Sequence, residues 1–152
     1  MQRLHVISGL TVNSPKEAFR HIAFNVGART GIEPSKLYDA LCILEKQDRS
    51  GIGDGVAIPH GKLPFLTHPV IAVARLNRAV DFEAVDRVPV DLVFVVLSPE
   101  DDGPLHLKRL ASVSRMARDK AFCERLRGST SEDAVRAVLM DSEMNAANAK
   151  AA

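Results

Sequence analysis

The strongest candidate for chemistry in this sequence is His60, which stands in the stretch GVAIPHGKLP (residues 55–64). Pro59 fixes its own φ and has no amide proton, and Gly61 lets the chain turn sharply. We therefore expect a short strand that ends with an exposed imidazole on an abrupt turn. A neutral imidazole, with a reference pKa of ~6.5, offers one nitrogen lone pair for attack. On local chemistry alone, an incidental histidine in a glycine-rich loop is an equally good interpretation.

Three glycines, Gly51, Gly53 and Gly55, alternate in the segment just before His60. Such a cluster can bring several backbone N–H groups together, an arrangement that suits an anion. The pattern lacks the G-x-x-x-x-G-K-[ST] spacing of a Walker loop, and no βαβ unit frames it as a dinucleotide fingerprint. It therefore favours neither of these nucleotide-binding classes.

His106 is the second candidate, near the start of an expected helix in the stretch GPLHL (residues 103–107). It lies just off the expected apolar stripe, so it could face another site across the edge of the core. Taken alone, a satisfied first-turn histidine is the favoured interpretation. The other three histidines have no neighbouring residues that indicate chemistry. His5 is interpreted as a sheet-edge or surface residue, His21 as a helix residue and His68 as a loop residue.

Two other reaction classes find little support. Two histidines and an acidic neighbour such as Asp54 could suggest zinc, but the chain has no H-x-x-x-H, H-E-x-x-H or C-x-x-C spacing. It also lacks the G-x-S-x-G pattern of a serine nucleophile. A metal site is therefore a weak interpretation of these residues, and serine nucleophilic catalysis is not supported.

Helix and strand signals alternate along the chain. The sequence Ser14-Pro15-Lys16-Glu17 predicts a capped helix that ends at Gly31, and a second helix follows Pro34 with Leu37, Leu41 and Leu44 on one face. Apolar runs predict strands over 70–74 and 90–97, with weaker candidates at 4–7 and 56–58. Residues 98–104 read as a loop. Further helices are expected over about 104–118, which would bury Leu107, Leu110, Ala111, Ser114 and Ala117, and over 119–127 and 131–140.

This order predicts an α/β fold, with a central mixed β-sheet flanked by helices in a single layered domain. The domain is expected to span residues 1–143, and the tail 144–152, which has no apolar period, is expected to be disordered.

Composition narrows the function classes. A net charge of +1 and seven aromatic residues argue against nucleic-acid binding. The longest strongly apolar run, 92–97, is far too short to span a bilayer, and the first residues lack a secretory signal. Cys42 and Cys123 are interpreted as reduced core thiols. We therefore expect a cytoplasmic protein without membrane insertion.

The stretch SGIGDGVAIPHGKL (residues 50–63) closely resembles the active-site signature of the bacterial phosphotransferase-system enzyme IIA proteins of the mannitol/fructose class, in particular their nitrogen-regulatory branch. The segment LHLKRLA (residues 105–111) is similar to the second histidine region of that family. The resemblance implies that His60 accepts a phosphoryl group and that His106 stabilises it. Backbone amides around Gly61 and Lys62 would bind the phosphoryl oxygens. Arg109 could add a charge, although a solvated role is favoured for it.

Two residues depart from the family pattern. Leu44 stands where the family usually has an arginine. Either Arg49 or Lys46 substitutes for that arginine, or its role is lost. Asp54 stands where asparagine is common, and a carboxylate close to an incoming phosphoryl group should repel it.

The resemblance implies transfer of a phosphoryl group from the phosphohistidine of an HPr-like carrier to Nε2 of His60. It implies no metal ion and no organic cofactor. The protein would then regulate its targets, such as a potassium transporter, a sensor kinase or a metabolic enzyme, through its phosphorylation state. One alternative is a sugar-specific IIA component that passes the phosphoryl group to a IIB transporter domain. Another is a degenerate binding module that has lost phosphoryl transfer.

Overall fold

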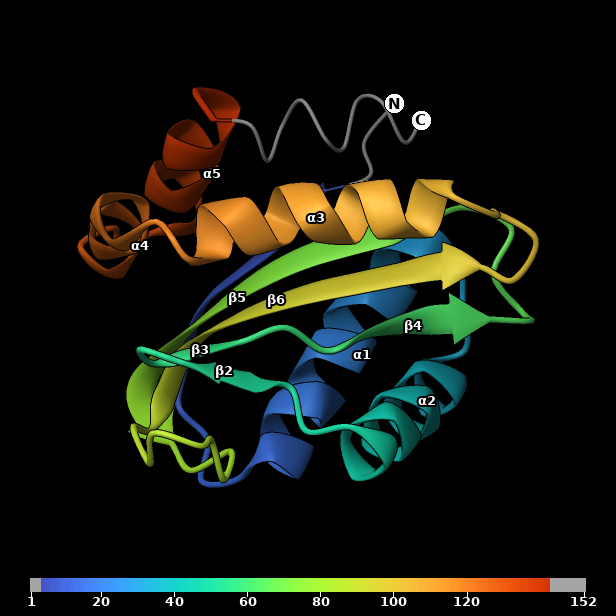
Figure 1. Ribbon diagram of the computed structural model, residues 1–152, viewed down its shortest axis with the longest axis horizontal. Helices are drawn as coiled ribbons and strands as arrows, with labels where there is room; N and C mark the ends of the chain where they lie inside the picture. Colours follow the sequence, from blue (N-terminus) through green and yellow to red (C-terminus); the bar gives the residue numbers. More distant parts are fainter. Residues whose placement is uncertain (1–3, 143–152) are drawn as a thin grey trace.

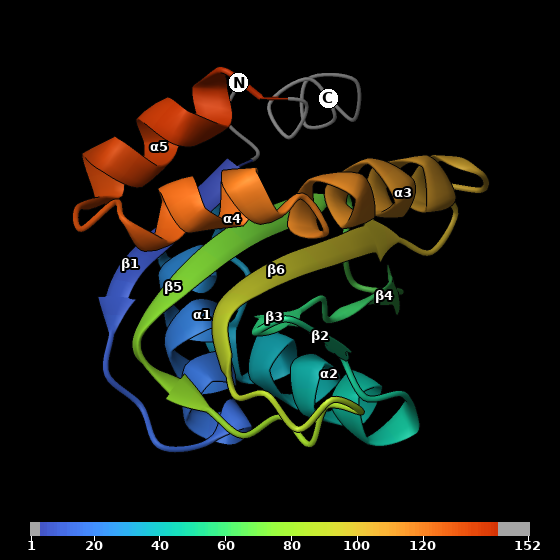
Figure 2. The ribbon, with the colours of Figure 1, turned by 60° about the vertical axis from the view of Figure 1, so that its left-hand side comes forward.

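The computed structural model describes residues 4–142, which form one mixed sheet between two layers of helices (Figures 1 and 2). The predicted α/β layered fold is thus confirmed. The strands are β1 (Leu4–Leu10), β2 (Gly51–Gly53), β3 (Val56–Ala57), β4 (His60–Leu63), β5 (Val70–Val80) and β6 (Val90–Pro99). The helices are α1 (Pro15–Thr30), α2 (Pro34–Gln47), α3 (Leu105–Ala117), α4 (Lys120–Arg127) and α5 (Glu132–Met140).

The sheet has the strand order β1-β5-β6-β3-β2, and β4 also pairs with β6. β1 is parallel to β5, β5 is antiparallel to β6, and both β3 and β4 run parallel to β6. β3 pairs with Leu92 and Val93, and β4 pairs with the stretch from Val96 to Pro99. The two short strands therefore follow one edge of β6 in succession, with a break at Ile58 and Pro59.

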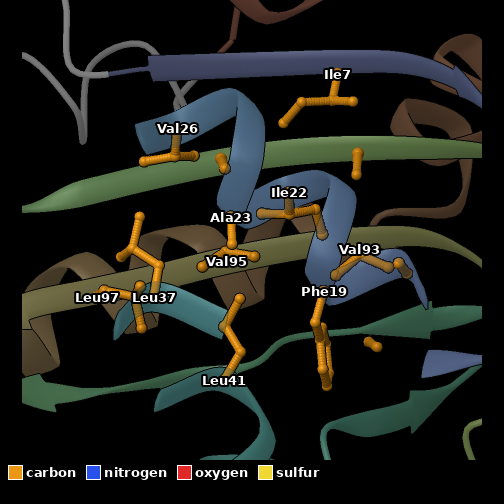
Figure 3. Close-up of a cluster of buried hydrophobic side chains, with 14 of the residues drawn as sticks. Ile7, Phe19, Ile22, Ala23, Val26, Leu37, Leu41, Val93, Val95 and Leu97 are labelled. Carbon is orange, nitrogen blue, oxygen red and sulfur yellow. The ribbon is translucent and has the colours of Figure 1, made fainter. Parts of the chain in front are cut away.

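Two apolar cores hold the three layers together. Figure 3 shows part of the first core, in which Phe19, Ile22 and Leu41 of α1 and α2 pack against Val93 and Val95 of β6. The second core joins the opposite face of the sheet to α3, α4 and α5. Consecutive residues of β6 alternate between the two cores, so β6 is buried on both faces.

The predicted start and end of α1 are confirmed. The Ser14 side chain accepts a hydrogen bond from the backbone N–H of Glu17 at 3.2 Å, and Pro15 occupies the first turn. Gly31 ends the helix in the left-handed conformation, with φ of 80°. The shorter helices predicted over 119–127 and 131–140 are confirmed as α4 and α5, with caps at Asp119 and Ser131.

Several predicted strand bounds were too short or were missed. β5 continues beyond residue 74 to Val80, through residues such as Asn77 and Arg78 that are exposed and therefore interrupt the apolar run. β6 extends through Ser98 and Pro99, which the composition had assigned to a loop. β2 and β4 were not predicted, because glycine and a lysine leave neither segment with an apolar pattern.

The buried face of α3 differs from the predicted one. Leu107 is 67% exposed and Ala111 is exposed, whereas the buried side chains are His106, Arg109, Val113, Met116 and Ala117. The spacing of three and four residues is helical, but its first two members are polar. The prediction is therefore confirmed for Ala117 and partly for Leu110 and Ser114, which are half-buried, but it is wrong for Leu107 and Ala111. A prediction that follows apolar residues alone misses the polar His106 and Arg109 at the buried start of the helix.

His5 lies on the edge strand β1, as predicted, but it is buried, with 5% of its surface exposed. Burial, with smaller contributions from the Arg29 and Arg136 cations, lowers the pKa of His5 to about 4. The folded protein thus keeps His5 neutral in a pH range where the unfolded chain binds a proton.

We expect this difference to make folding stability fall as the pH drops from about 6.5 towards 4. Between about pH 7.5 and about pH 5, the loss from His5 should reach about 2 kcal/mol. Urea unfolding of wild type and His5→Leu at both pH values measures this loss. The free energy of unfolding of His5→Leu should fall by about 2 kcal/mol less than that of wild type between the two pH values. His21→Leu, at an exposed position, is the control; equal pH dependence in His5→Leu and wild type would contradict the assignment.

Cys42 and Cys123 are both free thiols, as predicted, and Cys123 is buried while Cys42 is half-buried. Among the residues that the structure describes, no helix is both long and apolar enough to cross a membrane. The predicted tail, 144–152, lies outside the described residues, so the domain boundary stays a prediction.

Candidate active site

His60 is the first residue of β4 and is half-buried. The predicted abrupt turn at this point is wrong, because the chain continues as a strand through Gly61 to Leu63. The interruption lies one residue earlier, at Pro59, whose carbonyl still accepts a hydrogen bond from the Val96 amide at 3.0 Å. Pro59 thus separates β3 from β4 without removing the chain from the edge of β6.

The register of β4 decides which way each side chain points. His60 pairs with Val96 and Lys62 pairs with Ser98, while Gly61 pairs with Leu97 between them. Val96 belongs to the core on the α3 side and Leu97 to the core on the α2 side. Figure 1 shows β4 between α3 and α2. Because side chains alternate along a strand and paired residues share a face, the register places His60 and Lys62 on the α3 side and Gly61 on the α2 side.

His106 meets His60 from the first turn of α3. The centroids of the two imidazole rings are 6.1 Å apart, and the ring planes are tilted by 34°. His106 is buried, with 7% of its surface exposed. The two histidines, 46 positions apart in the sequence, thus form one pair between β4 and α3.

Behind His106 lies a buried polar cluster. The Ser98 Oγ atom lies 2.7 Å from Nδ1 of His106, and Arg109 donates from Nη1 to the same oxygen at 2.7 Å. The second guanidinium nitrogen forms an ion pair with Asp102 at 2.6 Å. Arg109 is only 4% exposed, so the solvated role predicted for it is wrong.

The surroundings of His106 disfavour its charged form. Burial lowers its pKa most, and the nearby His60, Lys62 and Arg109 add to this effect, while Asp102 opposes it. The contribution from Lys62 indicates that its ammonium group lies close enough to act on the site. His106 is therefore held neutral, beside positive charge that an anion could use.

Leu44 packs against Gly61, on the other side of the strand from the histidine pair. A Cβ built on Gly61 would lie 2.6 Å from one methyl carbon of Leu44 and 3.0 Å from the other. Gly61 has no positive φ, so the position requires glycine for this close approach and not for a turn. The residue at the position of the family arginine thus fills space beneath the strand that carries His60.

Gly61→Ala should therefore lower the free energy of unfolding by about 1–3 kcal/mol, through overpacking against Leu44. The cost should shrink in a Leu44→Ala background, where the new methyl group has room. Denaturant unfolding of the two single variants and the double variant measures this coupling. Gly31→Ala does not serve as a control because of its positive φ, whereas Gly128→Ala does, since its nearest contact is 3.5 Å away. An equal cost of Gly61→Ala in both backgrounds would refute the contact.

Arg49 lies away from the histidine pair. Its guanidinium forms an exposed ion pair with Glu83 at 3.0 Å, and both residues line a cavity of about 590 Å³ between α1, α2 and Phe82. Lys46 lines the same cavity. The structure thus places neither residue in the position proposed as a substitute for the family arginine.

The glycine segment also lies away from His60. Gly53 and Gly55 have positive φ and form the tight turn between β2 and β3, where Asp54 has φ of 57°. The Asp54 amide donates to Asp86 at 2.8 Å, and its carbonyl accepts from Arg127 at 2.8 Å.

The register fixes how far this turn lies from the site. Val56 pairs with Leu92 and His60 pairs with Val96, four residues further along β6. At a rise of about 3.3 Å per residue, these two positions are about 13 Å apart, and Asp54 lies beyond Val56. The expected repulsion between Asp54 and a phosphoryl group is therefore not supported, and the glycines shape a hairpin instead of an anion site.

Two members of the cluster were missed from the sequence. Ser98 ends an apolar strand and Asp102 lies in an acidic loop, so neither carries a motif of its own. The one available signal was the spacing of His106 and Arg109, which puts two polar residues on one helical face.

Within residues 4–142, no group of three or more His, Cys, Asp or Glu side chains is arranged to hold a metal ion.

Residues 1–142 match the family described as "Phosphoenolpyruvate-dependent sugar phosphotransferase system, EIIA 2". The chain belongs to this EIIA family. It is 42% identical over 134 residues to the nitrogen regulatory protein of Bradyrhizobium diazoefficiens, covering 88% of each protein. It is 35% identical over 131 residues to the nitrogen regulatory protein of Escherichia coli K12, covering 86% of this chain and 80% of the relative.

Solved structures agree with the EIIA assignment. The crystal structure of nitrogen regulatory protein IIA-Ntr from Neisseria meningitidis superposes with a TM-score of 0.82 at 30% identity, over 90% of this chain and 96% of that one. Enzyme IIA mannitol of Escherichia coli, solved in complex with phosphorylated enzyme IIB mannitol, has a TM-score of 0.74 at 20% identity, over 90% and 94% of the chains. This second likeness concerns the fold alone.

The resemblance inferred from residues 50–63 is thus confirmed. The protein is a phosphotransferase-system component of the nitrogen-regulatory type, with phosphoryl transfer in a mainly regulatory role.

Proposed function

We propose that His60 accepts a phosphoryl group from the phosphohistidine of an HPr-like carrier, and that the phosphorylation state of His60 sets how the protein binds its regulated targets. The observation that carries this proposal is the pairing of a half-buried His60 with the neutral, buried His106 at 6.1 Å between ring centroids. One histidine is accessible to a partner, and the other is fixed behind it.

The transfer needs one free lone pair on the acceptor. A neutral imidazole attacks phosphorus in line, the bond from phosphorus to the carrier nitrogen breaks, and the carrier imidazole takes back its electron pair. Such a step depends on alignment and on stabilising the phosphoryl oxygens. We assign the attack to Nε2 of His60, as the family resemblance implies.

Three features of the chain are placed to stabilise the phosphoryl oxygens. His106 can donate a hydrogen bond from its ring, and Lys62 faces α3 on the same side of the strand as His60. The N-terminus of α3, which has no side-chain cap, presents its positive dipole end here. Backbone donation near Gly61 and Lys62 stays part of the proposal.

The test is phosphorylation of the purified protein in the presence of enzyme I, an HPr-like carrier and radiolabelled phosphoenolpyruvate. We expect an acid-labile label on the protein that requires the carrier. A folded wild type that takes no label would contradict the proposal. It would favour the alternative, a binding module that has lost phosphoryl transfer. Fast onward transfer of the label to a IIB protein would favour the sugar-specific role, because a purely regulatory protein is expected to retain it.

A further inference from the structure

We infer that Asp102, Arg109 and Ser98 form a positioning network that holds His106 in a single tautomer, with its proton on Nε2 and its Nδ1 lone pair occupied. The network makes His106 a hydrogen-bond donor and prevents it from acting as a second phosphoryl acceptor. The inference deepens the proposed function, because it explains how two neighbouring histidines take different roles.

The hydroxyl of Ser98 determines the direction of the hydrogen bonds. Ser98 is fully buried, and its oxygen lies 2.7 Å from both Nη1 of Arg109 and Nδ1 of His106. A guanidinium can only donate, so Ser98 accepts from Arg109. The single hydroxyl proton of Ser98 then needs an acceptor, since a buried donor left unpaired is costly. Among residues 4–142, Nδ1 of His106 is the acceptor that lies within hydrogen-bond distance of this hydroxyl, and it can accept only when it carries no proton.

Arg109 and Asp102 keep this arrangement in place. The Arg109 guanidinium is 4% exposed and forms an ion pair with Asp102 at 2.6 Å, which compensates its charge beside Ser98. The titratable and charged groups that face His106 are His60 and Lys62 on β4, Arg109 on α3 and Asp102 in the preceding loop. Burial and the positive members of this set hold the pKa of His106 below its ordinary value. Protonation of Nδ1 would also break the hydrogen bond from Ser98.

The two rings therefore have different roles, His60 as the phosphoryl acceptor and His106 as the hydrogen-bond donor. With Nδ1 accepting from Ser98 and Nε2 protonated, His106 has no free lone pair with which to attack phosphorus. Its remaining polar group is the Nε2–H, which suits a phosphoryl oxygen on His60. Within residues 4–142, no hydrogen bond occupies a ring nitrogen of His60, so a neutral His60 keeps a lone pair for attack.

The experiment is long-range proton–nitrogen NMR of the ¹⁵N-labelled, unphosphorylated protein, which reads the tautomer of each histidine ring. We expect the His106 ring of the wild type to be in the Nε2–H form alone. In Ser98→Ala we expect a mixture of both tautomers of His106. We also expect transfer from the phosphorylated carrier to be about tenfold slower, because one oriented hydrogen bond is lost. The KM for the carrier should not change, because Ser98 is buried away from the surface.

Ser98→Thr keeps the hydroxyl and should restore the single tautomer. Ser114→Ala, a half-buried serine on α3 outside the network, is the matched control and should leave the His106 spectrum unchanged. An Nδ1–H tautomer in the wild type would overturn the inference, and so would a single Nε2–H tautomer in Ser98→Ala. If a variant does not fold, the tautomer of His106 in the wild-type spectrum is sufficient to test the inference.

The outcome is separable from that of the proposed function, because the tautomer is read without phosphate. A fixed tautomer in a protein that takes no label would refute the proposed function alone. A mixed tautomer in a protein that takes the label would refute the network alone.

Discussion

Replacing His60 with alanine is expected to abolish phosphorylation of the protein by the phosphorylated carrier. The alanine side chain has no lone pair, and His106, the nearest ring, is expected to have none free either. The label should fall to the background seen without carrier. Fold should be preserved, because His60 is only half-buried and its backbone pairing with Val96 does not need the ring. The measurement is carrier-dependent labelling, with the amide NMR spectrum as the test of folding.

His21 and His68 provide matched controls. Both are exposed and lie outside the site, on α1 and in the loop before β5 respectively. Alanine at either position should leave the rate of labelling at the wild-type value. Stoichiometric labelling of a folded His60→Ala protein would mean that another residue accepts the phosphoryl group.

Replacing His106 with alanine is expected to slow the transfer by about 10²- to 10³-fold, the typical cost of removing one preorganised donor to a developing oxyanion. The donor acts where water is largely excluded, since His106 is 7% exposed and is backed by the Ser98 hydroxyl. The extent of labelling at long times should stay close to one group per chain, because His60 remains. Rapid-quench kinetics with the phosphorylated carrier separate this rate effect from a loss of the acceptor.

His106→Gln tests the same donor with a smaller change. Its amide can donate towards His60, and we expect it to recover part of the lost rate. A wild-type rate in His106→Ala would show that the ring contributes nothing to the transfer. Leu107→Ala, at the exposed position beside it on α3, controls for disturbance of the helix surface.

The signature around His60 allowed the acceptor and the family to be predicted from sequence, because fourteen successive residues carry that information. The local shape was predicted less well. A proline followed two residues later by a glycine suggested a turn, yet Gly61 stays in a strand. What the sequence could not show is that β6 offers Val96 as a partner for His60 and that Leu44 comes within contact of Gly61.

The polar cluster behind His106 shows a second limit. The apolar pattern predicted Leu107 on the buried face of α3, whereas Leu107 is exposed and the structure buries His106 and Arg109. Burial of the Arg109 cation is unfavourable unless its charge is paired. The loop and strand that precede the helix bring Asp102 and Ser98 to it, and they supply the ion pair and the hydrogen bond. That information lies in the packing of β6 against α3 and not in the helix sequence.

Leu44 and Asp54, the two departures from the family pattern, have different consequences in the structure. Asp54 belongs to the hairpin held by Asp86 and Arg127, so its charge is remote from His60. Leu44 does lie beside the strand that carries His60, but it presents an apolar side chain there. The buried guanidinium of this site comes from Arg109, on the opposite side of β4.

The central claim is that His60 carries the phosphoryl group in front of a donating His106. Phosphorus–nitrogen correlation NMR of the ¹⁵N-labelled, carrier-phosphorylated protein tests it most directly, since the coupling identifies the ring and the nitrogen that bear the phosphorus. We predict one phosphorus signal, coupled to Nε2 of His60. A signal coupled to a nitrogen of His106, or to any other residue, would contradict the account.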